Sequence, residues 1–291
     1  MRTSTRVRIV SLALVLLAAP ACTTGERGAQ PTSSASRPVA STPSTTASAG
    51  GSATAVRSSG LAQRCGTPDV PSTVHRIRST DGVTLAAASI GSGPRGVLLL
   101  PQSDGDSCGW WSFGGPWLAS QGYRVLMLDL RCFGESTCPS RPQKIRERLA
   151  DVRAATAWLR AAGARSVAVV GVSMGGTVAM AAGADDQVSL AAAVDVSGEL
   201  TDTVLRSSPP LSARTAVAKL RVPVLYLTAA DDLGVDHAAD LRRLEQAPPA
   251  TVTSTLVPDS GDHGWSLLTT DGTTPSRWAL HIEAFLRTAL T

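Results

Sequence analysis

The sequence predicts an α/β domain, with an eight-stranded, mostly parallel sheet and helices on both of its faces. Short, continuous apolar runs recur along the C-terminal part of the chain, and helix-like stretches separate them. Strands that are apolar throughout are buried on both sides, as in a parallel sheet covered by helices. Two further strands precede these runs and are joined at Asp81-Gly82, a dipeptide typical of a tight turn. We therefore expect the domain to begin with an antiparallel hairpin.

The individual elements are expected in the following places. The hairpin strands cover 74–79 and 83–88, and the later strands cover 96–100, 123–128, 166–172, 191–196, 222–227 and 251–257. Helices are expected over 145–161, 174–184, 236–246 and 276–290. The spacing of Ile145, Leu149, Val152 and Leu159 places an apolar stripe on one side of the first helix. Short crossovers of the usual right-handed kind would make one domain of these elements.

The length and composition allow a sizeable core. Of 291 residues, 43% are hydrophobic and 17% are charged, whereas a solvated polar chain is poor in apolar residues. The formal net charge is +4, but three arginines lie in the first 21 residues, a segment without acids. No block of lysine and arginine with interleaved aromatics is present, so the sequence favours no nucleic-acid partner.

The N-terminus has the layout of an export signal. Basic residues precede an apolar run over 9–19, which is too short to span a bilayer, and Ala19-Pro20-Ala21 forms a small-residue cleavage site. The signal peptide is therefore expected over 1–21. Cys22 follows directly and resembles the acylated cysteine of bacterial lipoproteins, which predicts a lipid-anchored protein of the cell envelope. Plain secretion and an uncleaved anchor are the alternatives.

The segment 22–64 is expected to be a disordered tether ahead of the folded domain, 65–291. It is dominated by Ser, Thr, Ala, Gly and Pro and cannot bury enough apolar surface to offset its ordering entropy. Four cysteines follow it, and an even number in an exported chain predicts two disulfides. Those cysteines are Cys65, Cys108, Cys132 and Cys138. Three pairings are possible, and no CxxC spacing or nearby histidine supports a metal site.

The strongest chemical signal is the segment Gly171-Val172-Ser173-Met174-Gly175, which fits G-x-S-x-G. It follows an apolar strand and precedes a helix of small residues, which is the strand–turn–helix context of a nucleophile elbow. Such a turn is tight, and the glycines remove side chains that would clash in it. The helix N-terminus also offers N–H groups to a developing oxyanion. Ser173 is therefore the expected nucleophile.

A serine nucleophile needs a base and an acid that orients the base. Of the four histidines, His263 lies in a turn-rich loop after the last strand, where it can reach the same sheet edge as Ser173. The acid is expected between serine and histidine in chain order. Asp231 and Asp232 follow the strand 222–227, and Asp195 follows the strand before it. These positions alone do not decide among the three.

Together these motifs resemble the α/β-hydrolase superfamily over residues 70–290. The resemblance is carried by GVSMGG, VPVLYLTAADD and GDHGWSLL. Members often carry P-x-L-x-x-x-G-x-x-D before the acid. In that register Pro223 is the proline, Ala229 takes the glycine position, and the acid falls on Asp232. The resemblance thus implies the α/β-hydrolase fold with a small lid over 198–220, and a triad of Ser173, His263 and Asp232.

The resemblance also implies an oxyanion hole. One donor is the N–H of Met174, and the other comes from the loop after the strand 96–100. Many members have His-Gly there, whereas this chain has Pro101-Gln102. Because proline has no N–H, Gln102 is the expected second donor, although it can equally be an ordinary loop residue. Trp110 and Trp111 follow this loop and either line an acyl pocket or pack in the core.

The segment after 123–128 resembles the family's D-x-R-G-x-G-x-S, with Cys132 at a glycine position. In the fold, this loop and the loop of Cys108 leave neighbouring strands at one edge. The resemblance therefore implies a Cys108–Cys132 bridge with Cys65–Cys138. A local Cys132–Cys138 bridge remains open as the alternative.

The predicted function is a serine hydrolase, esterase-like, that cleaves an ester or related acyl bond of a small molecule through an acyl-enzyme on Ser173. The sequence contains no signature of a metal or organic cofactor. Amide or peptide cleavage by the same triad is one alternative. A non-catalytic surface lipoprotein that uses the fold for binding is the other. Dehalogenase or epoxide hydrolase chemistry is disfavoured, because those relatives have Asp where this chain has Ser173.

Overall fold

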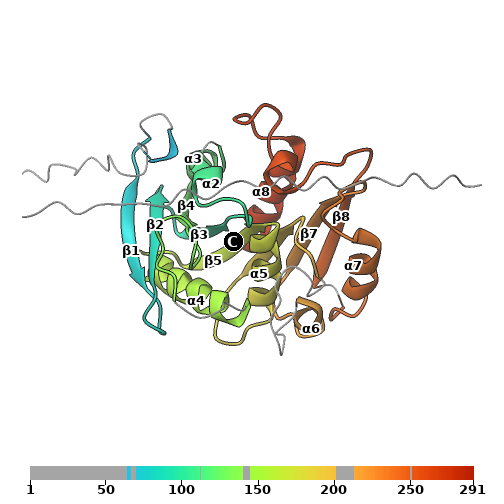
Figure 1. Ribbon diagram of the computed structural model, residues 1–291, viewed down its shortest axis with the longest axis horizontal. Helices are drawn as coiled ribbons and strands as arrows, with labels where there is room; N and C mark the ends of the chain where they lie inside the picture. Colours follow the sequence, from blue (N-terminus) through green and yellow to red (C-terminus); the bar gives the residue numbers. More distant parts are fainter. Residues whose placement is uncertain (1–63, 67–69, 112, 140–144, 201–212, 250) are drawn as a thin grey trace, which may run out of the picture. The chain divides into compact units, whose positions relative to one another are not determined.

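The computed structural model describes residues 64–66, 70–111, 113–139, 145–200, 213–249 and 251–291 (Figure 1). The predicted signal peptide, Cys22 and nearly all of the predicted tether lie outside the described residues, as does 201–212, the central part of the predicted lid. None of the described helices is long and apolar enough to cross a membrane.

Eight strands form a single sheet in the order β1-β2-β4-β3-β5-β6-β7-β8, which confirms the predicted sheet (Figure 1). The pairs β1–β2 and β2–β4 are antiparallel, and all other pairs are parallel. The strands are β1 (Thr73–Arg78), β2 (Thr84–Ile90), β3 (Arg95–Leu100), β4 (Tyr123–Leu128), β5 (Ser166–Val172), β6 (Ala192–Val196), β7 (Val224–Ala229) and β8 (Val252–Val257).

The ends of the strands differ from the predicted ends by only a few residues. The hairpin turn forms at Gly82, which has a φ of 88° and donates its N–H to the Ser79 carbonyl at 3.0 Å. The strand predicted from Val222 begins at Val224, directly after Pro223. Proline has no N–H for the ladder, and it commonly stands at the beginning of a strand.

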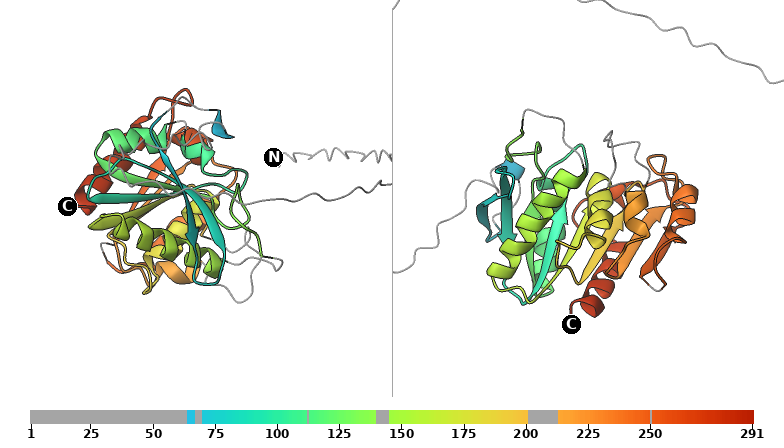
Figure 2. Two further views of the ribbon diagram at one scale, coloured as in Figure 1. Left: turned by 90° about the vertical axis from the view of Figure 1, so that its left-hand side faces the viewer. Right: turned by 90° about the horizontal axis from the view of Figure 1, so that it is seen from below.

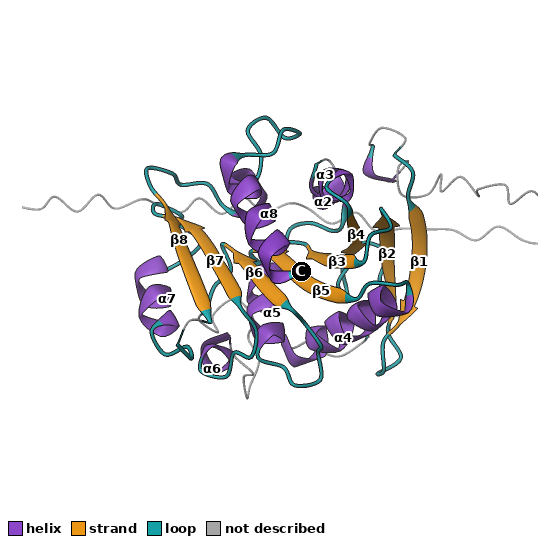
Figure 3. Cartoon of the chain, turned by 180° about the vertical axis from the view of Figure 1, so that it is seen from behind, coloured by secondary structure: helices purple, strands orange, loops and turns teal. Residues whose placement is uncertain are grey.

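Helices cover both faces of the sheet. The left view of Figure 2 looks along the sheet from the β1 side and shows the two helical layers, and Figure 3 shows the sheet from behind. One core packs under α4 (Ile145–Ala161), α5 (Met174–Gly183), α6 (Ala213–Val217) and α7 (His237–Leu244). The other packs under α2 (Cys108–Trp111), α3 (Gly114–Ser120) and α8 (Arg277–Ala289). The short helices α2, α3 and α6 escape prediction, since four to seven residues show no helical periodicity.

Alternate side chains of each central strand enter the two cores. In β3, Leu98 and Leu100 face the first core while Val97 and Leu99 face the second, and all four are inaccessible to solvent. Successive side chains of a strand point to opposite faces, so burial on both faces requires an apolar residue at every position. This is the physical reason for the continuous apolar runs in the sequence.

The parallel strands end at one edge of the sheet. Leu100 at the end of β3 pairs with Gly171 of β5, and Gly171 in turn pairs with Asp195 of β6. At the other side Ala229, the last residue of β7, pairs with Val257, the last residue of β8. The segments that follow β3, β5, β7 and β8 therefore leave from a common edge, and they carry Gln102, Ser173, Met174, Asp232 and His263.

The disulfides join Cys65 to Cys108 and Cys132 to Cys138. The Cys108–Cys132 pairing implied by the family resemblance is wrong, and the local Cys132–Cys138 alternative is confirmed. The Cα atoms of Cys132 and Cys138 are 4.2 Å apart because both belong to one tight loop after β4. Cys108 instead lies 5.2 Å (Cα–Cα) from Cys65.

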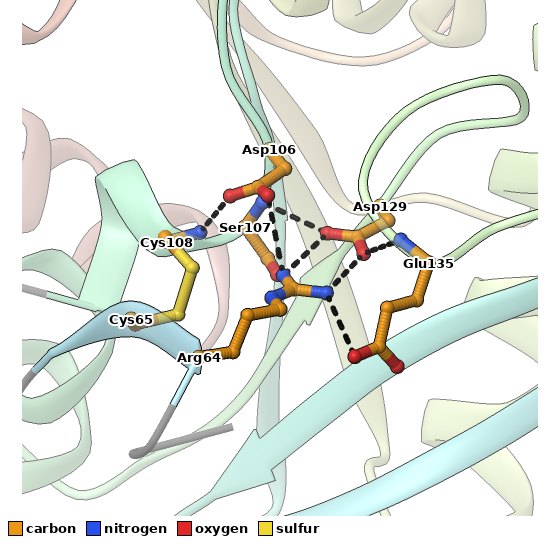
Figure 4. Close-up of a disulfide and its surroundings, with 7 residues drawn as sticks. All are labelled: Arg64, Cys65, Asp106, Ser107, Cys108, Asp129 and Glu135. Atoms are coloured by element: carbon orange, nitrogen blue, oxygen red, sulfur yellow. Dashed lines mark hydrogen bonds and ion pairs between the residues drawn. A yellow bond between two sulfur atoms is a disulfide. The ribbon is translucent and has the colours of Figure 1, made fainter. Parts of the chain in front are cut away.

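An ion-pair network holds the N-terminal end of the domain beside this disulfide (Figure 4). Arg64 donates to Asp129 at 2.9 Å and to the Ser107 hydroxyl at 3.0 Å. Asp129 also accepts the backbone N–H groups of Ser107 and Glu135, both at 2.9 Å. Burial opposes ionisation of Asp129, but the hydrogen bonds from Arg64 and Ser107 hold its pKa below the ordinary value. The charged carboxylate thus ties together three segments that are distant in sequence.

The two disulfides are expected to differ in their effect on stability. The Cys65–Cys108 bridge closes a loop with a sequence separation of 43, against 6 for Cys132–Cys138. In the chain-entropy model these loops correspond to about 4 and about 2 kcal/mol. Replacing Cys65 and Cys108 by Ala should therefore lower the free energy of unfolding more than replacing the other pair. Urea unfolding of the two double variants under oxidising conditions measures this, and equal losses would contradict it.

Candidate active site

Ser173 occupies a strained turn between β5 and α5. Its backbone has φ 51° and ψ −119°, in the region that only glycine adopts readily. The turn is held on both sides, because the Ser173 N–H donates to the Val196 carbonyl at 2.8 Å and the Thr177 N–H donates to the Ser173 carbonyl at 3.0 Å. The hydroxyl is thereby fixed at the N-terminus of a ten-residue helix.

The glycines of the G-x-S-x-G motif are required by close packing. A Cβ atom on Gly171 would overlap the backbone of Gly175, and one on Gly175 would lie 2.5 Å from the Leu100 carbonyl oxygen and 2.6 Å from that of Pro101. A side chain at Gly171 would push β5 apart from the first turn of α5, and one at Gly175 would push that turn away from the end of β3. The loop after β3 therefore runs directly beside the first turn of α5.

His263 lies between β8 and the short 3₁₀ helix η1 (Gly264–Leu267), and its partner is Asp232 in the loop after β7. The His263 Nδ1 is 2.8 Å from Asp232 Oδ2 and 3.0 Å from Oδ1. The carboxylate is buried and also accepts the Gly234 N–H at 2.8 Å, whereas about a third of the His263 side chain is exposed. With Nδ1 held by the carboxylate, Nε2 is the nitrogen able to act as a base.

The structure separates the three candidate acids. Asp231 is exposed, and its N–H donates to the Ser260 carbonyl at 2.9 Å. Asp195 is fully buried beneath the elbow, where one oxygen accepts the Gly198 N–H at 2.8 Å. Of these three carboxylates, all of which lie in the described part of the chain, only Asp232 is hydrogen-bonded to His263.

The histidine loop packs against the elbow. The Gly264 N–H donates to the Ser197 hydroxyl at 3.1 Å, and a Cβ atom on Gly264 would lie 3.8 Å from the Cβ of Val172. No hydrogen bond joins Ser173 to His263 among the residues that the structure describes. Such contacts commonly tighten only when substrate binds. Ser197, which has a positive φ of 53°, was not identified from the sequence, because nothing in the local pattern marks it.

The two expected oxyanion donors lie on adjoining segments. Met174 begins α5, where the first N–H groups of a helix have no partner within the helix. Gln102 lies in the loop pressed against that turn, and its side chain donates from Nε2 to Asp104 at 2.7 Å. Trp110 and Trp111 are 2% and 1% exposed and belong to the core. This agrees with the prediction that they pack in the core, one of the two alternatives for these residues.

The other histidines lie outside this constellation. His75 Nε2 is 2.8 Å from the Ser89 hydroxyl, and its ring contacts Trp158 with 4.3 Å between ring centroids and 48° between the ring planes. His281 is 3.3 Å from the Thr255 hydroxyl, on the outer strand. His237 begins α7.

Comparison with known proteins bears on the fold. The sequence matches the family model described as alpha/beta hydrolase fold over residues 97–219. An esterase of Pyrococcus furiosus, 15% identical, superposes with a TM-score of 0.63 over 79% of this chain and 94% of the esterase. The chain has the α/β-hydrolase fold. A thermophilic esterase of Thermogutta terrifontis, 19% identical, gives 0.59 over 75% and 100% of the two chains.

An α/β hydrolase of Penicillium also superposes on this chain, with a TM-score of 0.58 at 15% identity over 76% and 99% of the two chains. No curated protein sequence is significantly similar. In the α/β-hydrolase fold of this chain, the predicted nucleophile, acid and base lie after β5, β7 and β8, respectively.

A buried acidic pair lies beneath the elbow of this α/β-hydrolase domain. Asp195 and Asp240 are both inaccessible to solvent. Burial raises the pKa of Asp195 well above its ordinary value, and the nearby charge of Asp240 raises it further, while the hydrogen bond from Gly198 opposes the shift. Burial likewise raises the pKa of Asp240, although its hydrogen bonds with Leu200 and Arg243 oppose this. Burial and the charge of Asp240 thus both favour the neutral form of Asp195.

Asp195→Asn should make stability less sensitive to pH. The unfolded chain ionises Asp195 near its ordinary pKa of 3.8, whereas the folded chain keeps the proton to higher pH. Stability from this group is therefore complete below pH 3.8 and lost as pH rises, by up to about 1.4 kcal/mol per pH unit until the folded pKa is passed. Urea unfolding from pH 4 to 8 should show the difference between variant and wild type moving in favour of the variant. Parallel curves would refute this expectation.

Proposed function

We propose that this protein belongs to the α/β-hydrolase superfamily as a serine hydrolase that cleaves an ester or related acyl bond. The proposal rests on the position of Ser173 relative to the hydrogen-bonded pair of His263 and Asp232. A serine held in a strained strand-to-helix turn shares a sheet edge with a histidine that is hydrogen-bonded to a buried carboxylate. Strain of this kind costs about 1–3 kcal/mol and persists mainly where it serves a purpose. Nucleophilic catalysis supplies that purpose.

The proposed reaction proceeds through an acyl-enzyme. His263 Nε2 accepts the Ser173 proton as Oγ attacks the substrate carbonyl carbon. The carbonyl oxygen becomes an oxyanion and accepts the N–H groups of Met174 and Gln102, each worth about 10²–10³-fold in rate. As the tetrahedral adduct collapses, His263 gives its proton to the departing alcohol. Asp232 stabilises the imidazolium throughout.

The second half of the proposed reaction repeats these roles with water. His263 accepts a proton from water as the water oxygen attacks the acyl carbon of the ester on Ser173. Collapse of this second adduct breaks the bond to Ser173 Oγ, which recovers its proton from His263. The products are a carboxylic acid and free enzyme. A small-molecule acyl substrate is supported by the naming of two structural neighbours as esterases.

Export to the cell envelope is part of the proposal. Disulfides persist in oxidising compartments, and the domain has two. They support an exported protein, in agreement with the predicted signal peptide. Anchoring through an acylated Cys22 would then tether the hydrolase to a membrane.

Ser173→Ala should abolish turnover of p-nitrophenyl acetate and labelling by a fluorophosphonate probe. The variant removes only the Oγ that the probe phosphonylates, so the domain should stay folded. Far-UV circular dichroism and the melting temperature serve as the control. Undiminished labelling of the folded variant would overturn the assignment of Ser173.

Asp232→Asn should lower kcat for the same ester by about 10⁴-fold, because an amide at this position holds the imidazole in the wrong tautomer. Asp231→Asn is the matched control, since it makes the same change at the neighbouring exposed position and should leave kcat within about twofold. Steady-state kinetics of both variants measure the contrast. A larger loss of kcat in Asp231→Asn than in Asp232→Asn would show that Asp232 is not the acid.

A further inference from the structure

Trp265, two residues after His263, packs on a surface made by the loop after β3 and α2. A Cβ atom on Gly105 would lie 2.7 Å and 2.9 Å from atoms of the Trp265 six-membered ring. One on Gly109 would overlap three atoms of the same ring. Trp110 meets the indole edge-on, with 6.1 Å between ring centroids and 88° between planes. We call Gly105, Gly109 and Trp110 the Trp265 seat.

This contact joins two loops that the sheet does not hold together. Gln102 follows β3 and His263 follows β8, and three strands (β5, β6 and β7) separate β3 from β8. The Gln102 side chain also reaches the histidine loop, because a Cβ atom on Gly264 would overlap the Gln102 side-chain oxygen. The distance between the histidine and the loop after β3 is therefore set by packing of Trp265 and Gly264.

The seat itself is firmly anchored. Cys108, next to Gly109, is bonded to Cys65, and its N–H donates to Asp106 at 2.8 Å (Figure 4). The Ser107 N–H donates to the buried Asp129. The seat is thus tied to the end of β4 and to the N-terminal end of the domain.

Packing, without a hydrogen bond from the indole to the described residues, holds Trp265 on its seat. The Trp265 Nε1 is buried and has no hydrogen-bond partner among the described residues. The ring rests on two glycines, and the absence of their side chains makes the space that it fills. A contact of this kind is sensitive to a single added methyl group, because close-packed surfaces cannot absorb it without a shift.

We propose that Trp265 is a positioning residue that, through its seat, holds His263 in register with the loop of Gln102 and with Ser173. The inference rests on the proposed function, since it concerns the alignment of that site. An error of about 1 Å in such an alignment can cost about 100-fold in rate. A substrate that is still bound but poorly aligned loses kcat rather than affinity.

Gly109→Ala tests the proposal, with kcat per active site counted by fluorophosphonate titration. Its methyl group should displace the indole and lower kcat for p-nitrophenyl acetate by about 10- to 100-fold, with KM changed by less than about threefold. Adding Trp265→Phe removes the outer ring atoms that the methyl overlaps. The double variant should regain kcat up to about the value of Trp265→Phe alone, which a merely destabilised domain would not do.

Gly115→Ala is the matched control. Its Cβ would overlap Met127 in the same core, but Met127 is not part of the seat. It should lower the melting temperature and leave kcat per active site within about twofold. Trp265→Phe alone keeps the test valid if Gly109→Ala does not fold, and should lower kcat with KM unchanged.

The outcomes are distinguishable. A kcat loss in Gly109→Ala that Trp265→Phe restores, with Gly115→Ala unaffected, supports the positioning role. Equal kcat values in Gly109→Ala, Gly115→Ala and an active, labelled wild type overturn this role and leave the hydrolase proposal intact. A wild type that neither labels nor turns over ester overturns the hydrolase proposal, and the positioning role with it.

Discussion

Ser173 lies in a left-handed turn whose two flanking elements both press against the end of a neighbouring strand. The turn is possible because Gly171 and Gly175 bring the chain within contact of itself and of the carbonyl oxygens of Leu100 and Pro101. Hydrogen bonds from Ser173 to Val196 and from Thr177 to Ser173 then hold the strained conformation. Relaxation would require β3, β5 and α5 to move apart, so the packing of the whole central sheet maintains the geometry of one serine.

Gln102, Asp232 and His263 lie at the same edge of the sheet as Ser173, for a topological reason. Parallel strands in register end together, and the loops after them must share the space above that edge. The sheet brings these loops close but does not align them with one another. Contacts between the loops align them. These contacts are the hydrogen bond of the Asp232 carboxylate with His263 and the packing of the Trp265 indole on its seat.

The buried carboxyl groups near this edge differ in their effect on the stability of the domain. Asp129 is charged and satisfied by Arg64 and by backbone N–H groups, so it acts as a tie between segments. Asp195 accepts one N–H and lies near the acidic Asp240. Its burial raises its pKa, so the stability that this group contributes is lost as pH rises. Its place directly beneath the elbow, where it leaves no room for a Cβ on Gly176, links this cost to the packing of the turn.

Local sequence was sufficient for the features that local physics governs. Continuous apolar runs predict strands buried on both faces. All eight predicted strands are present, as an N-terminal antiparallel hairpin followed by parallel strands. The elbow at Ser173 was predictable because its glycines are a steric requirement that is met within five residues. His263 is the predicted base because its loop follows the last strand, and that loop packs against the elbow in the structure.

The tertiary structure decided what depends on the distance between segments far apart in the chain. Asp231 and Asp232 are neighbours in sequence, and only the backbone direction after β7 shows which carboxylate meets His263. The pairing of Cys65 with Cys108 depends on where Arg64 docks on Asp129, and no local pattern encodes that contact. The seat of Trp265 is formed by glycines more than 150 positions away. The local sequence thus determined the strands, the elbow and the loops that carry Ser173, Asp232 and His263, and packing between loops determined how these side chains are placed.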